Sequence, residues 1–287
     1  MQKDKITLLF DNGIHTVIMD GVDFGIVDYT GLESTDYEIT TQNNISGYGA
    51  KITGKKMLPR PVSVEFESQD FAGRAAMRQD IIGFFTPYST GTLTVSHMGT
   101  IREIAYEVQS FATNSRNVND HVSGLVELIC INPAFLGATL MDQIATWIGG
   151  WKWKFSLPFK MRTSGASRAI FVNGGHLPAP PMIEFHGPAD YPLVRNVTTG
   201  AEIRVNRQLA SSEVLYINTD FGNKSVEIEH NGVRANAFNY IDIALMGSGS
   251  FNNFWLLPGE NIIEYETENA TVPQQVVITY RERYLGV

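Results

Sequence analysis

The residues that could do chemistry are scattered along the chain. Its histidines are His15, His97, His121, His176, His186 and His230, and they fall on different expected strands or turns. Two ligands on one helix or turn can reach the same ion, so a metal site usually leaves a local spacing in the sequence. No such spacing occurs here. Folding can still bring distant histidines together, but the residue pattern supports no metal site, and we expect none.

Short motifs that organise common reactions are also missing from the sequence. It contains no GxSxG elbow, no GxxxxGKS/T loop, no HExxH pair and no CxxC pair. Acyl transfer, P-loop phosphoryl transfer and zinc-dependent proteolysis therefore lack their usual residues. Gly247–Gly249, followed by Ser250, precedes no expected helix, whereas an anion site needs a helix N-terminus or a nest of amides. We interpret this stretch as a turn, and we expect no enzyme and no cofactor.

Two further features have both a chemical and a structural interpretation. Glu227 and Glu229 alternate on one expected strand and so share a face, a geometry that could hold a cation, although two acids on a solvated face are far more common. Cys130, the single cysteine, lies in the apolar run Leu125–Ile131. We interpret it as a buried strand thiol and not as a nucleophile. One cysteine allows neither an intramolecular disulfide nor a cysteine-based zinc site.

An aromatic run is the last candidate site. Trp151, Trp153 and Phe155 alternate with lysines, so on a strand the rings face one way and the amines the other. Stacked tryptophans can form a carbohydrate platform, and equally, rings that face inward can anchor a core. We favour the core for this run. We favour it also for Trp255, which lies in an apolar segment before a Pro-Gly turn.

The composition is that of a folded, turn-rich protein. Hydrophobic residues make up 43% and charged residues 18% of the chain, which also has 26 Gly and 12 Pro. The formal net charge of -8 argues against nucleic acid or an anionic membrane surface as the main partner, because both attract basic surfaces. The N-terminal segment shows no signal-peptide pattern, and no apolar run approaches the ~18 residues of a membrane span. We expect synthesis in the cytoplasm and no membrane insertion.

Most of the chain shows short apolar segments of period two between Gly, Asn, Asp and Pro, which is typical of all-β proteins. Asp11-Asn12-Gly13 predicts a hairpin, because Asn-Gly supplies the positive φ angles of a tight turn. One helix is expected over Asp70–Phe85, with Asp70 as its N-cap. The expected strands are 6–10, 14–18, 61–67, 91–97, 101–111, 122–131, 151–161, 169–172, 182–186, 193–198, 202–206, 213–218, 224–229, 261–267 and 275–284.

The pattern divides the chain into two expected domains, residues 1–135 and 136–287. At the boundary, we expect residues 134–150 to form a short helix or an irregular crossover. The second domain has many short strands at regular spacing, as in a β-sandwich. Its last strand, within residues 275–287, either completes the sandwich or returns to the first domain, and both alternatives stay open.

Residues 30–58 behave like neither domain. The segment is rich in Thr, Asn, Gly and Ser, and loops of this length inside compact domains are usually functional or disordered. Two alternating stretches, one with Tyr37 and Ile39 and the other with Tyr48 and Ile52, flank a turn. We interpret the segment as a projecting β-arm that needs a partner surface, the alternative being a floppy surface loop. Tyr37, Ile39, Tyr48 and Ile52 are the candidate subunit-interface residues.

Several stretches of the second half follow one extended pattern. They are FSLPFKM (155–161), FVNGGHLPAPPMIEFHGPADYPLVRNVTTGAEIRVNRQL (171–209), EVLYINTDFGNKSV (213–226) and FWLLPGENIIEYET (254–267). This order resembles the C-terminal region of siphophage distal tail proteins, the tail-tip family often called Dit. The first half, from the hairpin through GVDFG and the arm to PVSVEFES and its helix, is similar to the ring-forming domain of that family.

The resemblance implies an assembly protein. Members of the family are similar in placing an N-terminal domain in a hexameric ring at the end of the tail tube, from which a galectin-like β-sandwich projects. The ring joins the tail tube protein to the baseplate or tail-spike protein, and DNA passes through its channel without specific binding. A homo-hexamer in the virion, made in the host bacterial cytoplasm, is the implied state of this chain.

The expected fold class is therefore mainly β: an N-terminal β domain with one helix and a projecting β-arm, and a C-terminal galectin-like β-sandwich. The alternative function is a carbohydrate-binding module that contacts host cell-wall glycans through the sandwich. A sugar-binding galectin face needs a His-x-Asn-x-Arg cluster and a Trp with charged neighbours. The nearest approach here is His230-Asn231-Gly232-Val233-Arg234, with the Asn displaced onto an expected turn, and Trp255 is followed by Leu-Leu-Pro.

Overall fold

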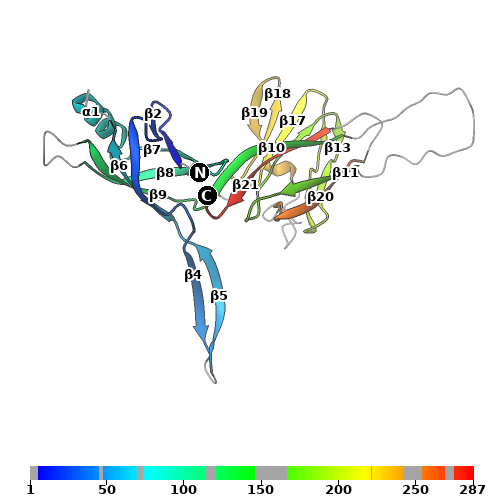
Figure 1. Ribbon diagram of the computed structural model, residues 1–287. Helices are drawn as coiled ribbons and strands as arrows, with labels where there is room; N and C mark the ends of the chain where they lie inside the picture. Colours follow the sequence, from blue (N-terminus) through cyan, green and yellow to red (C-terminus); the bar gives the residue numbers. More distant parts are fainter. Residues whose placement is uncertain are drawn as a thin grey trace, which may run out of the picture. The chain divides into compact units, whose positions relative to one another are not determined.

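The structure is a computed structural model, and it describes residues 6–44, 48–69, 74–113, 121–145, 167–220, 222–241, 254–268 and 275–287. These residues lie mostly in strands and include one α-helix, so the expected mainly β fold class is confirmed (Figure 1). The chain forms two compact units, Met1–Ala138 with Tyr284–Val287, and Thr139–Arg283. Within the described residues, no helix is both long and apolar enough to cross a membrane.

A closed sheet surrounds the core of the first unit. Its strands are β1 (Thr7–Asp11), β2 (Thr16–Met19), β3 (Phe24–Thr30), β6 (Arg60–Ser68), β7 (Thr90–His97), β8 (Thr100–Thr113) and β9 (Ser123–Cys130). They follow the order β8-β7-β1-β2-β3-β6-β9, and a further pairing of β8 with β9 joins the two ends. Neighbours are antiparallel except β2 and β3, which meet in parallel at the single pair Met19–Phe24. The sheet is therefore weakest between β2 and β3.

Apolar residues of period two fill this closed sheet. In β6 buried and more exposed residues alternate, with Val64 and Phe66 inside, as expected for a strand with one face on a core. Phe10 lies edge-on to Phe85, with ring centroids 5.3 Å apart, a favoured geometry for aromatic pairs. The helix expected over Asp70–Phe85 is present as α1 (Arg74–Phe84). Its predicted N-cap, Asp70, lies outside the described residues.

The predicted Asn-Gly hairpin joins β1 to β2. Gly13 has φ +82°, a conformation that glycine adopts without steric cost. The Gly13 amide donates to Asp11 Oδ1 at 2.7 Å, and the His15 amide donates to Asn12 Oδ1 at 2.8 Å. Short polar side chains therefore satisfy the backbone of the turn that they form, which is why these residue types predict it.

The prediction of a helix or irregular crossover at residues 134–150 is wrong for its described part. Residues Phe135–Ala145 form strand β10. Leu136, Leu140 and Ile144 are spaced four apart, and this spacing fits one face of a helix as well as one face of a strand. Gly137 and Thr139 are weak helix formers, so local propensity favours the strand.

The second unit is the expected β-sandwich. Its strands, besides β10, are β11 (Ser167–Asn173), β12 (Met182–His186), β13 (Ala189–Asp190), β14 (Leu193–Asn196), β15 (Ala201–Arg204), β16 (Gln208–Leu209), β17 (Glu213–Asn218), β18 (Ser225–His230), β19 (Val233–Asn236), β20 (Gly259–Glu266) and β21 (Gln275–Tyr284). One sheet has the order β19-β18-β17-β12-β21-β10 and the other β11-β20-β14-β15. Side chains such as Phe185, Ile217 and Ile263 form the core between them.

The last strand and the residues after it differ in their partners. Strand β21 pairs with β12 over five residue pairs, which include Ile183–Ile278, and so completes the sandwich sheet. The final residues, Tyr284–Val287, group with the first unit. There the Val287 amide donates to Leu32 O at 3.0 Å, and the Arg102 guanidinium lies 3.8 Å from the centroid of the Tyr284 ring.

Cys130 is fully buried at the end of β9, as predicted for a strand thiol. Burial raises the pKa of Cys130 to about 12, while the nearby Arg60 acts to lower it. We therefore expect the native thiol to react with Ellman's reagent at least ~100-fold more slowly than the thiol of the guanidinium-unfolded chain, because reaction needs local opening. Rapid labelling of the native protein at neutral pH would contradict this.

Candidate subunit interface

The arm is an exposed β-hairpin. Strand β4 (Tyr37–Asn43) pairs with β5 (Ala50–Met57), and the two form a sheet of their own. Every residue of β4 is exposed. Figure 1 shows the hairpin extending away from the rest of the first unit. On one face, Glu38 binds Lys56 across the strands at 2.8 Å. The segment is therefore an ordered hairpin in its described residues, as the alternating pattern predicts.

A β-bulge decides which side chains share the other face. Tyr37 and Ile39 lie opposite Met57 and Lys55, but the register then shifts, and Thr41 lies opposite Ile52. Directly opposed residues of an antiparallel pair point to the same face. Without the extra residue in β5, Ile52 would oppose Gln42 and point to the face of Glu38. The bulge therefore turns Ile52 onto the same face as Tyr37 and Ile39.

The structure brings three of the four predicted interface residues together. Tyr37, Ile39 and Ile52 are 59%, 54% and 50% exposed on one face of the hairpin. Tyr48 is fully exposed at the turn, outside the paired residues. Sequence reasoning missed Met57, which opposes Tyr37 and so joins the same face. The result is a one-sided apolar surface that the hairpin itself cannot cover.

A buried arginine fixes the base of the arm. Arg60, at the start of β6, is 1% exposed, and burial lowers its pKa below the ordinary value. Its Nε donates to Pro133 O at 2.9 Å. The remaining hydrogen-bond acceptors are the carbonyl oxygens of Gly31, Ser34 and Leu285 and the hydroxyl of Thr35. One guanidinium thus holds together the chain entering the arm, the chain just after β9 and the C-terminal residues.

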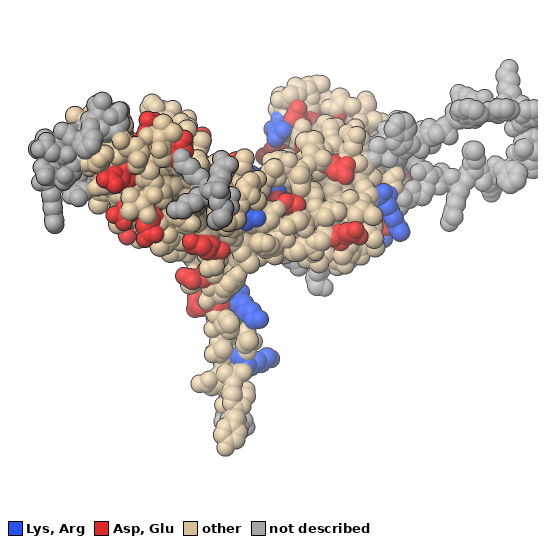
Figure 2. Space-filling model, in the orientation of Figure 1, with Lys and Arg blue, Asp and Glu red and all other residues tan. Residues whose placement is uncertain are grey.

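The charges of the first unit are segregated (Figure 2). The arm, Tyr37–Met57, contains three lysines and one glutamate, whereas the rest of residues 1–138 contains 15 acidic and 7 basic side chains. Lys56 is paired with Glu38. Lys51 and Lys55 are exposed and have no acidic partner within the described residues. A basic arm and an acidic body are therefore complementary surfaces on the same chain.

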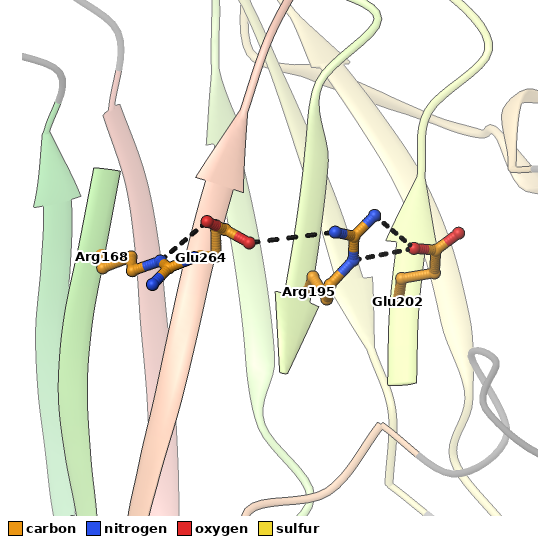
Figure 3. A network of polar contacts seen from close by, with 4 residues as sticks. All are labelled: Arg168, Arg195, Glu202 and Glu264. Atoms are coloured by element: carbon orange, nitrogen blue, oxygen red, sulfur yellow. Dashed lines mark hydrogen bonds and ion pairs between the residues drawn. The ribbon is translucent and has the colours of Figure 1, made fainter. Parts of the chain in front are cut away.

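The alternative surface is the outer face of the β11-β20-β14-β15 sheet. Figure 3 shows Arg168, Glu264, Arg195 and Glu202 in a row across its strands. Arg168 Nε donates to Glu264 at 2.8 Å, and Arg195 Nε donates to Glu202 at 3.0 Å. Arg195 also lies 3.9 Å from the second oxygen of the buried Glu264. These charges bind one another and so tie neighbouring strands together; a sugar would have to displace those contacts.

The lectin-like segment is a turn with its arginine engaged. Asn231 and Gly232 have φ +52° and +77° and connect β18 to β19. Arg234 Nε donates to Glu229 at 2.9 Å, its NH1 lies 3.6 Å from Glu227, and its guanidinium lies 4.0 Å from the Tyr216 ring centroid. The cation between Glu227 and Glu229 is thus the side chain of Arg234.

The other candidate sites remain unassembled in the described residues. There, no group of three or more His, Cys, Asp or Glu side chains could hold a metal ion. The aromatic run Trp151–Phe155 and the turn Gly247–Gly249 lie outside the described residues. Trp255 is only partly buried, and its neighbours Phe254 and Leu256 fill the core in its place. The expectation of a core tryptophan is therefore wrong at this position.

Together, the closed β unit with its exposed arm and the β-sandwich define the class, a mainly β protein of two units. A family model described as the siphovirus-type tail component, C-terminal domain, matches residues 174–284. No match is found among curated proteins. The resemblance to distal tail proteins is therefore confirmed over residues 174–284.

Solved structures have the same fold over almost the whole chain. The crystal structure of SPP1 Dit (gp 19.1), described as a paradigm of the hub adsorption apparatus in phages that infect Gram-positive bacteria, matches with a TM-score of 0.64 and 13% identity, over 98% of this chain and 99% of that chain. The phage P2 baseplate with Ca matches with a TM-score of 0.52 and 10% identity, over 96% and 97%. Its form with Sr matches with a TM-score of 0.52 and 11% identity, over 95% and 97%.

The Arg60 contacts lead us to expect that a substitution of this residue changes the stability of the first unit and not that of the second. A lysine has its donors on one atom and cannot reach acceptors on three segments, so Arg60→Lys should lower the free energy of unfolding of this unit by ~2–4 kcal/mol. Cys130 lies in the first unit and all four tryptophans lie in the second, so thiol exposure and tryptophan fluorescence report on them separately in urea.

The matched control is Arg168→Lys, which makes the same substitution at an exposed arginine of the sandwich. It should change the free energy of unfolding of the second unit by only ~0–1 kcal/mol. In Arg60→Lys the thiol transition should move to lower urea while the tryptophan transition stays in place. An unchanged thiol transition would show that the Arg60 network does not stabilise the unit.

Proposed function

We propose that this chain is the distal tail protein of a siphophage or prophage. Six copies form a closed ring at the tail tip, and the ring joins the tail tube to the baseplate or tail-spike proteins. The observation that carries the proposal is the match of residues 174–284 to the siphovirus-type tail component. The fold likeness to a hub protein and to baseplate chains agrees with it.

The arm supports self-assembly. An isolated two-stranded hairpin is marginally stable in water, and this one leaves Tyr37, Ile39 and Ile52 exposed on one face. A neighbouring subunit that covers this face would bury apolar area and satisfy the free strand edges. Such a contact is heterologous, because the arm of one copy meets a different surface of the next. Repetition of this contact closes into a ring or continues as a filament.

The charge balance suits a channel for DNA. The net charge of -8 disfavours binding to the phosphate backbone, so DNA passes through the ring without specific contacts. The place of action is the virion, at the tail tip, after synthesis in the cytoplasm of the host bacterium. The interface residues proposed for the ring are Tyr37, Ile39, Tyr48 and Ile52.

Removing the arm tests the ring. Leu32 and the carbonyls of Gly31 and Ser34 belong to the body of the unit, so only residues 37–57 are replaced. The Leu58 amide donates to Asp36 O at 3.0 Å, so a short Gly linker closes the gap without strain. We expect this variant to be folded and monomeric at concentrations where the intact chain forms hexamers, as measured by light scattering and native mass spectrometry.

Substitutions on the two faces of the hairpin provide the control. Tyr37→Ser with Ile39→Ser should also give monomers, because these residues lie on the apolar face. Thr40→Ser with Gln42→Ser changes the other face and should leave hexamers. Intact rings from the variant without residues 37–57 would rule out the arm as the ring contact.

Carbohydrate binding by the sandwich is the alternative function. We expect the full chain to give no specific signal on an array of bacterial cell-wall glycans, because Arg195 and Arg234 are already held by glutamates. Specific binding lost in Arg195→Gln or Trp151→Ala, with circular dichroism unchanged, would favour the carbohydrate-binding module instead.

A further inference from the structure

The first unit contains a cleft of about 710 Å³ between strand β2 and helix α1. Val17 and Ile18 line it on the strand side, and Ile81 and Phe84 line it on the helix side. The cleft lies next to the weakest pairing of the closed sheet, where β2 and β3 share the single pair Met19–Phe24.

The strand side of the cleft has an open edge. Strand β2 pairs with β1 over Thr16–Met19, but on its other edge only Met19 has a strand partner within the described residues. The edge of Thr16–Ile18 is therefore free to pair with an added strand, the usual way in which sheet edges recruit partners.

The rim of the cleft is apolar and acidic. Ile18 lines it and is 44% exposed, and Ile14 and Val22, each next in sequence to a lining residue, are 81% and 68% exposed. Asp23 and Asp80 are exposed lining residues, and none of the lining residues is a lysine or arginine. A fitting partner therefore has a free strand edge, apolar side chains on one face and positive charge.

We propose that this cleft receives the β4–β5 arm of a second copy of the chain. The arm meets each requirement: within the described residues its strands pair only with each other, Ile39 and Ile52 are exposed on one face with Lys55 beside them, and the exposed Lys51 lies on the other face. Opposite charges on the two surfaces give the contact its register and hold the arms of successive copies in the same orientation. The inference rests on the proposed ring and names the surface that accepts the arm.

A second acidic surface exists but lacks the open edge. Glu65 on β6 and Glu107 on β8 are exposed on the outside of the closed sheet. Both strands are paired on both edges, β6 with β3 and β9, and β8 with β7 and β9. An added strand finds no free backbone there, so the cleft is the favoured receptor, and Glu65 and Glu107 serve as a control.

A charge exchange tests the proposal in the full-length chain. Lys51→Glu with Lys55→Glu makes the arm acidic, and Asp23→Lys with Asp80→Lys makes the cleft basic. Each pair alone should weaken self-association at least ~10-fold at low salt, by sedimentation velocity, because like charges then face each other. All four substitutions in one chain should restore association. Glu65→Lys with Glu107→Lys makes the same charge change and should leave association unaltered.

The outcomes separate this inference from the proposed ring. If arm removal gives monomers but Asp23→Lys with Asp80→Lys still gives rings, the arm stands as the ring contact and the cleft is overturned as its receptor. Loss of rings in the Glu65→Lys and Glu107→Lys control would place the receptor on the outer sheet instead. Rings that survive arm removal overturn both proposals.

Disulfide trapping provides a second measurement that does not need a stable ring. Chains with Ile52→Cys and chains with Ile18→Cys are mixed under mild oxidation. The native Cys130 is buried and should not react. A mixed disulfide dimer should form faster than with the exposed Ile170→Cys in place of Ile18→Cys. Equal rates for the two pairs would overturn the proposal.

Discussion

The buried guanidinium of Arg60 is the interaction on which the first unit depends. A charge removed from water is costly unless its donors are all bound. Here backbone carbonyls and a hydroxyl supply the acceptors, and they come from the chain entering the arm, from Pro133 and from Leu285. Only arginine presents donors in a rigid fork that reaches several segments at once. The closed sheet, the base of the arm and the C-terminal residues are therefore fixed by a single side chain.

This fixed base holds the exposed arm in one orientation. Association loses less conformational entropy when the binding element is already held in its bound orientation. The chain enters and leaves the hairpin between Asp36 and Leu58, whose backbone hydrogen bond closes the base next to the Arg60 network. The bulge then gathers Ile52 with Tyr37 and Ile39 on one face. The fixed base and the one-sided apolar face of the arm therefore suit a contact between subunits.

Local rules account for much of the fold, and what they leave unexplained has three sources: an ambiguous spacing, an irregular register and contacts between distant segments. The Asn-Gly hairpin, the strand around Cys130 and most sandwich strands follow from turn residues and period-two alternation. Strand β10 was open to misassignment because a spacing of four fits both periods. Strand β3 has a register shift between Ile26 and Asp28 that breaks its alternation. The Arg60 network could not be predicted from the sequence, because its acceptors lie far apart along the chain.

The arm residues show the same limit at the candidate interface. Alternation alone identified Tyr37, Ile39 and Ile52 as apolar positions, but only the bulge places them on one face. Net charge has the same limitation. The value of -8 shows that the chain is acidic overall, but it does not show that the hairpin is basic and the body acidic. Bodies of like charge repel one another, whereas an arm of opposite charge attracts the body it meets. Low ionic strength strengthens both the repulsion and the attraction, and the proposed arm contact is the place where the attraction acts.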